Sequence, residues 1–119
     1  MTSGSRRFLA ALAMAASLLL PAIPAAAGDC TGRVVGVRPL SQYNHAAGRG
    51  FLAVRTGPGG GYRQIGEVYA GDRVSVWDRR GGWYAVTCMA GRCRSPLWGQ
   101  PTPSGWVSRS YVRASGVCP

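Results

Sequence analysis

The chain has 119 residues, room for one ordinary domain, and carries 14 basic against 4 acidic side chains for a net charge of +10. Hydrophobic residues make up 46% and charged residues only 15%, which excludes a highly charged, aromatic-poor disordered chain. The 18 glycines and 8 prolines favour a small, mostly β domain over a coiled coil or a multidomain enzyme.

Residues 1–27 have the pattern of a secretory signal peptide. Arg6-Arg7 supplies the positive start, Phe8 to Leu20 is an apolar stretch with one serine, Ser17, and Ala25-Ala26-Ala27 is an A-x-A cleavage site. The apolar stretch is shorter than the roughly 18 residues of a spanning helix, so we expect cleavage rather than a retained anchor. The sequence therefore predicts an exported protein, periplasmic or secreted, with no stable membrane span.

The mature chain remains strongly basic, and every basic residue in the sequence is an arginine. The arginine bias also fits a GC-rich genome. The charge favours anionic envelope polymers, lipid headgroups or acidic proteins as partners. Nucleic acid would suit the charge equally well, but we do not expect an exported protein to meet it.

Four cysteines, an even number in an oxidising compartment, indicate two disulfides. Zinc is the alternative, but the only close pair is Cys88-x4-Cys93, and His45 is the only histidine. Three pairings are possible. We favour Cys88–Cys93, which closes a short loop, and Cys30–Cys118, which ties the two ends of the domain together.

Short strands separated by glycine turns follow one another along the mature chain. The first is expected over Arg33 to Arg38, before a polar loop over Ser41 to Gly50. Leu52 to Arg55 alternates in hydrophobicity, and Gln64 to Tyr69 forms the next strand, with Gly66 indicating a bulge.

The second half of the chain continues in the same way. Arg73 to Asp78 alternates and is followed by a hairpin turn over Arg79 to Gly82. Trp83 to Cys88 then pairs back, and Gly105 to Arg109 closes the series after a long loop. Five or six short antiparallel strands of this kind predict an all-β fold, a small barrel or two packed orthogonal sheets.

Six motif blocks in order carry a resemblance to a known family. They are Leu52-Ala53-Val54-Arg55-Thr56-Gly57-Pro58, Tyr62 with Ile65-Gly66, Gly71-Asp72-x-Val74-x-Val76, Gly82-Trp83-Tyr84-x-Val86, Gly105-Trp106-Val107 and Tyr111-Val112. This order resembles the bacterial SH3 (SH3b) domain, whose pattern runs roughly L-x-V-R-x-G-P, G-D-x-V-x-V, G-W-x-x-V and G-W-V-x-x-x-Y-L. The resemblance implies an SH3-like barrel.

The resemblance also implies a division of the chain. Residues 28–50 would form an N-terminal strand and loop, residues 51–113 the SH3b-like domain, and residues 114–119 a C-terminal tail. The segment 88–104, which carries two of the cysteines, is far longer than the usual loop and departs from the family pattern.

A shallow aromatic groove is the site that the resemblance implies. Transferred residue by residue, its lining is Trp83, Trp106 and Tyr111, with Tyr62 a looser candidate. Alternation points the same way, because Val86 and Val107 should face the core and turn both tryptophans outward. Such rings bind peptides or sugars by stacking. The alternative is that the rings only cap a small barrel.

Arginines near this groove are a second candidate feature. Arg55 and Arg109 could flank the rings and attract a carboxylate such as a peptide terminus. The alternative is that both arginines are simply solvated.

Trp98, in the proline-rich loop 88–104, has two interpretations. It could be a contact for a partner, presented by a disulfide-anchored loop, or it could fold over the barrel as a lid, even onto the groove itself. We favour the lid.

Catalysis finds little support in the sequence. His45 is a lone histidine in a glycine-bounded loop, which usually indicates polar surface. No two of the four carboxylates are adjacent in sequence, and Asp72 is expected to accept backbone N–H groups in a turn. We therefore expect no enzyme, no cofactor and no metal.

The expected function is that of a monomeric, non-catalytic binding module. Peptidoglycan peptides and an envelope protein are the ligands that the resemblance implies. The alternative is a structural or interaction subunit of an envelope complex that docks through the loop 88–104 and binds no small ligand.

Overall fold

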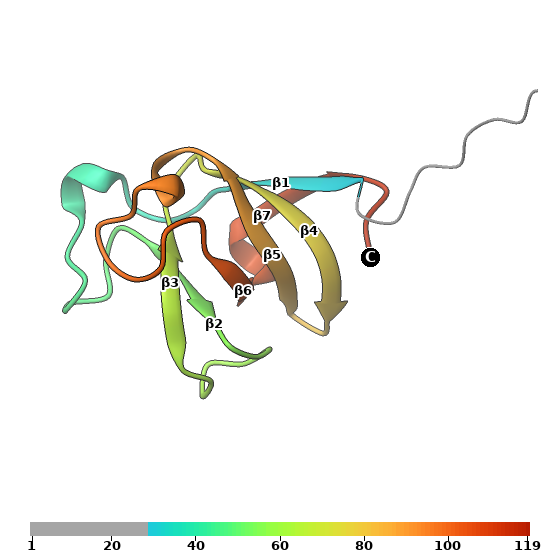
Figure 1. Cartoon of the computed structure of the whole chain (residues 1–119), viewed down its shortest axis with the longest axis horizontal. Helices are drawn as coiled ribbons and strands as arrows, with labels where there is room; N and C mark the ends of the chain where they lie inside the picture. Colours follow the sequence, from blue (N-terminus) through green and yellow to red (C-terminus); the bar gives the residue numbers. More distant parts are fainter. Residues whose placement is uncertain (1–28) are drawn as a thin grey trace, which may run out of the picture.

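The computed structural model describes residues 29–119, which form seven antiparallel strands in one curled sheet (Figure 1). The strands are β1 (Cys30–Val34), β2 (Leu52–Arg55), β3 (Gln64–Val68), β4 (Arg73–Arg80), β5 (Trp83–Ala90), β6 (Ser104–Ser108) and β7 (Val112–Gly116). Their order across the sheet is β3-β2-β6-β5-β4-β1-β7. Three 3-10 turns punctuate the loops, η1 (Leu40–Gln42), η2 (Arg92–Arg94) and η3 (Arg109–Tyr111). The all-β prediction is confirmed, with seven antiparallel strands instead of five or six.

All seven strands contribute side chains to a single core. The predicted alternation places Val74, Val76, Val86 and Val107 inward, and all four are fully buried. Because each strand is short and one face is apolar, the sheet must curl to remove that face from water. The opposite face of β4, β5 and β6 remains outside.

The strand boundaries differ from the predictions at both ends of the domain. The first strand runs over Cys30–Val34 instead of Arg33 to Arg38, because Gly36 adopts a positive φ of 77° that ends it. At the other end, β7 occupies residues 112–116 and pairs with β1 along its whole length. The segment Arg113 to Gly116 has no apolar alternation, so its own sequence does not indicate a strand.

The expected bulge in β3 is present. Val54 pairs with Gly66 and Arg55 pairs with Gln64, so Ile65 is the extra residue. Although Ile65 has no partner residue on β2, its side chain packs against the core, as the bulge prediction required.

Two disulfides join the cysteines in the pairing that the sequence analysis favoured, Cys30 to Cys118 and Cys88 to Cys93. No cysteine of residues 29–119 is free. The first bridge fixes the outer pair β1–β7, and the second anchors the base of the long loop to β5.

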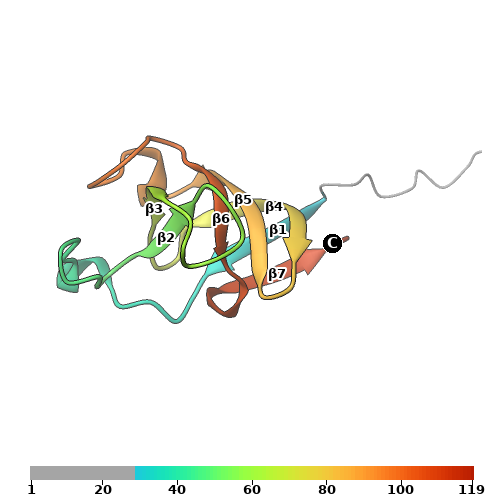
Figure 2. The same ribbon diagram turned by 90° about the horizontal axis from the view of Figure 1, so that it is seen from below.

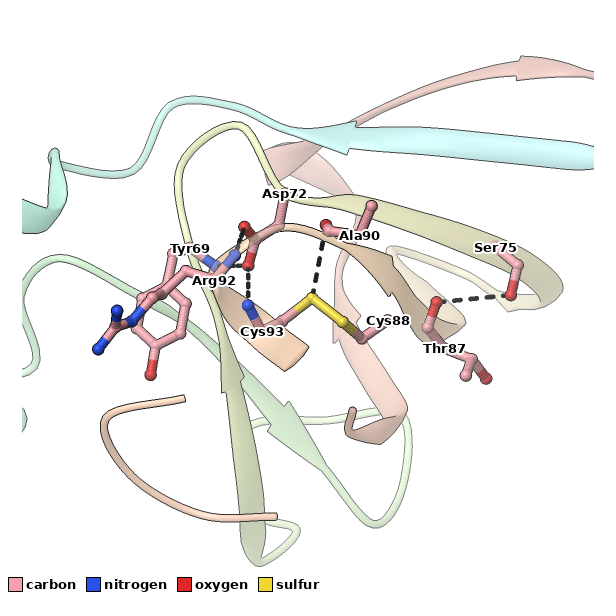
Figure 3. Close-up of a disulfide and its surroundings, with 8 residues drawn as sticks. All are labelled: Tyr69, Asp72, Ser75, Thr87, Cys88, Ala90, Arg92 and Cys93. Carbon is pink, nitrogen blue, oxygen red and sulfur yellow. Dashed lines mark hydrogen bonds between the residues drawn. A yellow bond between two sulfur atoms is a disulfide. The ribbon is translucent and has the colours of Figure 1, made fainter. Parts of the chain in front are cut away.

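Asp72 fastens the same loop base from the other side (Figure 3). Its carboxylate accepts hydrogen bonds from the backbone N–H groups of Tyr69 (2.8 Å), Arg92 (2.8 Å) and Cys93 (3.0 Å). Burial raises the pKa of Asp72, and the three N–H donors oppose that rise. The prediction that Asp72 has a structural role in its turn is confirmed.

The predicted signal peptide, 1–27, lies outside the described residues. Within residues 29–119, no helix has the length and the apolar character that crossing a bilayer requires.

Candidate functional site

Two tryptophans, one exposed and one partly buried, form a pair on the outer face of the sheet. Trp77 of β4 and Trp106 of β6 lie with ring centroids 6.4 Å apart and planes tilted by 53°. Between them runs β5, where Ala85 is opposite Trp106. Ala85 is fully buried although it belongs to the outer face, and Trp77 is half exposed. The small alanine thus lets the two large rings approach each other over the middle strand.

A bulge and a chain of hydroxyls hold Trp77 in place. The register shifts between Val76 and Asp78, so Trp77 is the bulged residue of β4. Its indole Nε1 donates a hydrogen bond to Thr87 Oγ1 (3.2 Å), and Thr87 Oγ1 lies 2.8 Å from Ser104 Oγ. The ring therefore has a defined orientation on the sheet surface.

Arginines border the tryptophan pair. The guanidinium carbon of Arg80 lies 5.9 Å from the ring centroid of Trp106, within cation–π range. Arg55 of β2 is opposite Trp106 in the strand register, and its Nη1 donates to the carbonyl of Tyr62 (2.9 Å). We call the surface made by Trp77, Trp106, Arg80 and Arg55 the tryptophan face.

The predicted groove residues divide between two places. Trp83 begins β5 opposite Arg80 and, two residues before Ala85, shares the outer face with Trp106. Tyr62 is half exposed and lies against Gly57 and Gly59 in the β2–β3 connection, joined to the face through Arg55.

Tyr111 lies elsewhere. It packs on Gly36 and lines a hollow of about 240 Å³ together with Val37, Arg38 and Phe51. The structure therefore groups Trp83, Trp106, Arg55 and Tyr62 and separates Tyr111 from them. It adds Trp77 of β4, to which the sequence analysis assigned no role in binding.

Arg109, the other arginine expected beside the groove, packs on a different ring. Its guanidinium carbon lies 5.9 Å from the ring centroid of Tyr84, and its Nη1 donates to the carbonyl of Gly81 (3.2 Å).

The loop 88–104 does not cover the tryptophan face. It lies against β3 at the end of the barrel away from the C-terminus, next to the segment 38–50 (Figures 1 and 2). Gln100 N donates to the carbonyl of Ile65 (3.1 Å), and Pro103 is packed on Gly66 so closely that an added Cβ on Gly66 would clash with it. Trp98 stacks on His45 with centroids 4.3 Å apart. Trp98 thus packs on the domain, as a lid would, but it covers His45 and not the predicted aromatic groove.

A buried carboxylate joins the two loops at this end. Glu67 has no exposed surface. Its Oε1 accepts hydrogen bonds from the hydroxyls of Tyr43 (2.8 Å) and Tyr69 (2.7 Å), and its Oε2 lies 2.6 Å from His45 Nδ1. We call Glu67, Tyr43, Tyr69, His45 and Trp98 the Glu67 cluster.

The cluster perturbs the phenols. Burial, assisted by the hydrogen bond to Glu67 and by its charge, raises the pKa of Tyr43 to about 12. Burial and the same carboxylate also raise the pKa of Tyr69, although that hydroxyl accepts a hydrogen bond from Leu97 N (2.8 Å). Both phenols therefore remain protonated donors across the neutral range.

The expectation that His45 is ordinary polar surface was wrong. Its ring stacks with those of Phe51 and Trp98 and is oriented by Glu67. His45 and Tyr43 are 22 and 24 positions from Glu67 in sequence. Sequence spacing therefore could not indicate that they contact Glu67. A carboxylate also orients a histidine in catalytic triads; here the ring in addition packs on two aromatic side chains, Phe51 and Trp98. The contacts of the cluster hold together the segment 38–50, β3 and the long loop.

The geometry defines a small all-β barrel with one open aromatic and basic face and one end that is cross-linked by the Glu67 cluster. Residues 50–113 match the sequence model of the family described as Bacterial SH3 domain, and the chain belongs to that family. No curated protein matches the chain. Members of the family are generally non-catalytic binding modules, and the two disulfides are consistent with an extracellular location.

Proposed function

We propose that the protein is an exported, monomeric, non-catalytic binding module that recognises a cell-envelope ligand through the tryptophan face. The leading ligands are peptidoglycan peptides, and an envelope protein is the next. The observation that carries the proposal is the pair formed by the exposed Trp77 and the partly buried Trp106, bordered by Arg80 and Arg55.

The chemistry of the face suits a ligand with both apolar and acidic parts. The indole rings offer flat apolar area for a sugar ring or a peptide side chain. The guanidinium groups of Arg80 and Arg55 can pair with carboxylates, which a peptide supplies at its terminus and acidic side chains. Because Trp77 is already oriented by Thr87, its ring does not have to be ordered on binding.

Co-sedimentation with purified murein sacculi tests the ligand. We expect Trp106→Ala and Trp77→Ala each to weaken retention by about tenfold, which corresponds to about 1.4 kcal/mol for a buried ring contact. Tyr111→Ala is the matched control, because Tyr111 is an exposed aromatic that lines the separate hollow beside Phe51, and it should leave retention unchanged.

Three outcomes would count against this assignment. If sacculi retain nothing, the peptidoglycan ligand is ruled out and an envelope protein becomes the candidate. If Tyr111→Ala alone abolishes retention, the ligand occupies the hollow lined by Tyr111 instead of the tryptophan face. If moderate salt releases all the protein and no tryptophan matters, the interaction is charge attraction alone.

Docking through the loop 88–104 is the competing function. The contacts of Gln100, Pro103 and Trp98 with the barrel leave this loop already committed to β3 and His45. Leu97 remains about half exposed. A partner captured by the wild type and lost with Leu97→Ser, while both tryptophan variants retain it, would favour the loop.

Export has its own test. Mass spectrometry of protein recovered from the periplasm or medium should find a chain that begins at Gly28. Recovery there with Met1 still attached would contradict the predicted cleavage after Ala27.

A further inference from the structure

Three exposed arginines lie in a row on the outer face of β4, β1 and β7. Arg33 of β1 is directly opposite Arg73 of β4 on one side and Arg113 of β7 on the other. Residues directly opposite in antiparallel strands point to the same side of the sheet, and strands are spaced about 4.8 Å apart. The three side chains therefore leave the same surface side by side. We call them the arginine row.

No ion pair holds this row in the described part of the chain. No side-chain hydrogen bond, ion pair or ring contact involves these three guanidinium groups within residues 29–119. Glu67 and Asp72 are buried and occupied elsewhere. Like charges directly opposite each other destabilise a sheet, so the fold gains nothing from this arrangement.

A row of hydroxyls runs beside the arginines. Thr31 of β1 is opposite Ser75 of β4 and Ser115 of β7. Thr31, Ser115 and the three arginines line an open hollow of about 420 Å³ whose remaining wall is the backbone of Gly32. The hollow thus offers charged forks and hydroxyl donors to one ligand, and no large apolar side chain lines it.

We propose that the arginine row is a binding site for a linear, phosphate-bearing polyanion. Guanidinium groups bind phosphate oxygens through two parallel hydrogen bonds, and three groups in line match a ligand with repeated charges. A lipid surface fits less well, because membrane binding of a surface patch gains from apolar side chains that enter the bilayer.

The site is separate from the tryptophan face. Along β4, Arg73, Ser75 and Trp77 occupy alternate outward positions, so the hydroxyl row lies between the two surfaces. The inference therefore does not depend on the proposed peptidoglycan ligand.

The site is tested by titrating the mature protein with short-chain inorganic polyphosphate and measuring the binding affinity by calorimetry. The triple variant Arg33→Gln, Arg73→Gln, Arg113→Gln should bind about 30-fold more weakly than the wild type. The matched control changes three exposed arginines elsewhere to glutamine and removes the same charge; it should lose no more than about threefold. Its positions are Arg63, Arg92 and Arg94.

Thermal unfolding of the two variants at low salt gives a second readout. Because the row opposes like charges in two adjacent pairs, its removal should raise Tm by about 2–6 °C, and the control should not. A rise in Tm together with lost binding supports a site maintained at a cost to the fold.

Several results would overturn the proposal. They are a wild type that does not bind polyphosphate, equal weakening in both triple variants, or a row variant that binds as the wild type does. Binding to phosphatidylglycerol vesicles without binding to polyphosphate would replace the polymer with a membrane surface. If the row variant still binds murein, the proposed role of the tryptophan face stands even where the arginine-row proposal fails.

Discussion

Replacing Glu67 with alanine should destabilise the domain more than any other single carboxylate change. The carboxylate is fully buried and lies within hydrogen-bond distance of two phenol hydroxyls and His45 Nδ1. Hydrogen bonds to a charged group are each worth about 1.5–3 kcal/mol. Removing one partner from a buried charged network typically costs about 3–5 kcal/mol. We therefore expect a loss of about 4 kcal/mol in the free energy of unfolding.

Urea unfolding at neutral pH, followed by tryptophan fluorescence with the disulfides intact, measures this loss. For a domain of this size, 4 kcal/mol corresponds to a fall in Tm of roughly 15–30 °C. Glu67→Gln keeps the volume and the oxygen that accepts from Tyr43 and Tyr69, so it should cost only about 1–2 kcal/mol. Asp78→Ala, at a partly exposed carboxylate, is the control and should stay within about 0.5 kcal/mol.

The reasoning is refuted if Glu67→Ala costs less than about 1 kcal/mol. That result would mean that water satisfies the cluster and that the two loops do not depend on it. A cost shared equally by the alanine and glutamine variants would show instead that the charge, and not the hydrogen-bonded shape, is what the cluster requires.

Three further predictions follow from the same contacts. Trp98→Ala should cost about 1–2 kcal/mol, because it removes one partly exposed stacking ring; an unchanged Tm would mean that the stack on His45 contributes nothing. Replacing both Cys30 and Cys118 with serine should cost about 4–5 kcal/mol on the chain-entropy model, since their sequence separation is 88; a chemical-denaturation midpoint close to that of the wild type would contradict it. Stability should fall above pH 10, because a phenol whose pKa is raised in the folded state stabilises it below the unfolded pKa of about 10 and loses that contribution as pH approaches about 12; Tyr43→Phe should flatten this loss in an alkaline unfolding series.

The strands that the sequence predicted are those whose own side chains alternate. Val74 and Val76 in β4, and Val86 in β5, mark the inward face without help from the rest of the chain. The family motif then fixes their order. By contrast, β7 forms because β1 is available to pair with it and Cys118 is tied to Cys30. A strand that depends on its neighbour in this way leaves no periodic trace in its own residues.

To predict which surface residues meet, one must know how the strands pair residue by residue, and the sequence does not give this register. Outward orientation of Trp106 followed from alternation, but its approach to Trp77 depends on a bulge in β4 and on the small Ala85 between them. The Glu67 cluster could not be predicted from the sequence, because its residues come from three segments that meet only in the folded structure. His45, judged alone, has no distinguishing neighbour in sequence.

The most direct test of the binding surface is a nitrogen-15 NMR titration of the protein with soluble peptidoglycan fragments. Each of the four tryptophans gives one indole N–H signal. We predict that the signals of Trp77 and Trp106 shift on binding while that of Trp98 stays in place. Shifts confined to Trp98, or four unchanged signals at saturating fragment, would contradict the assignment of the tryptophan face.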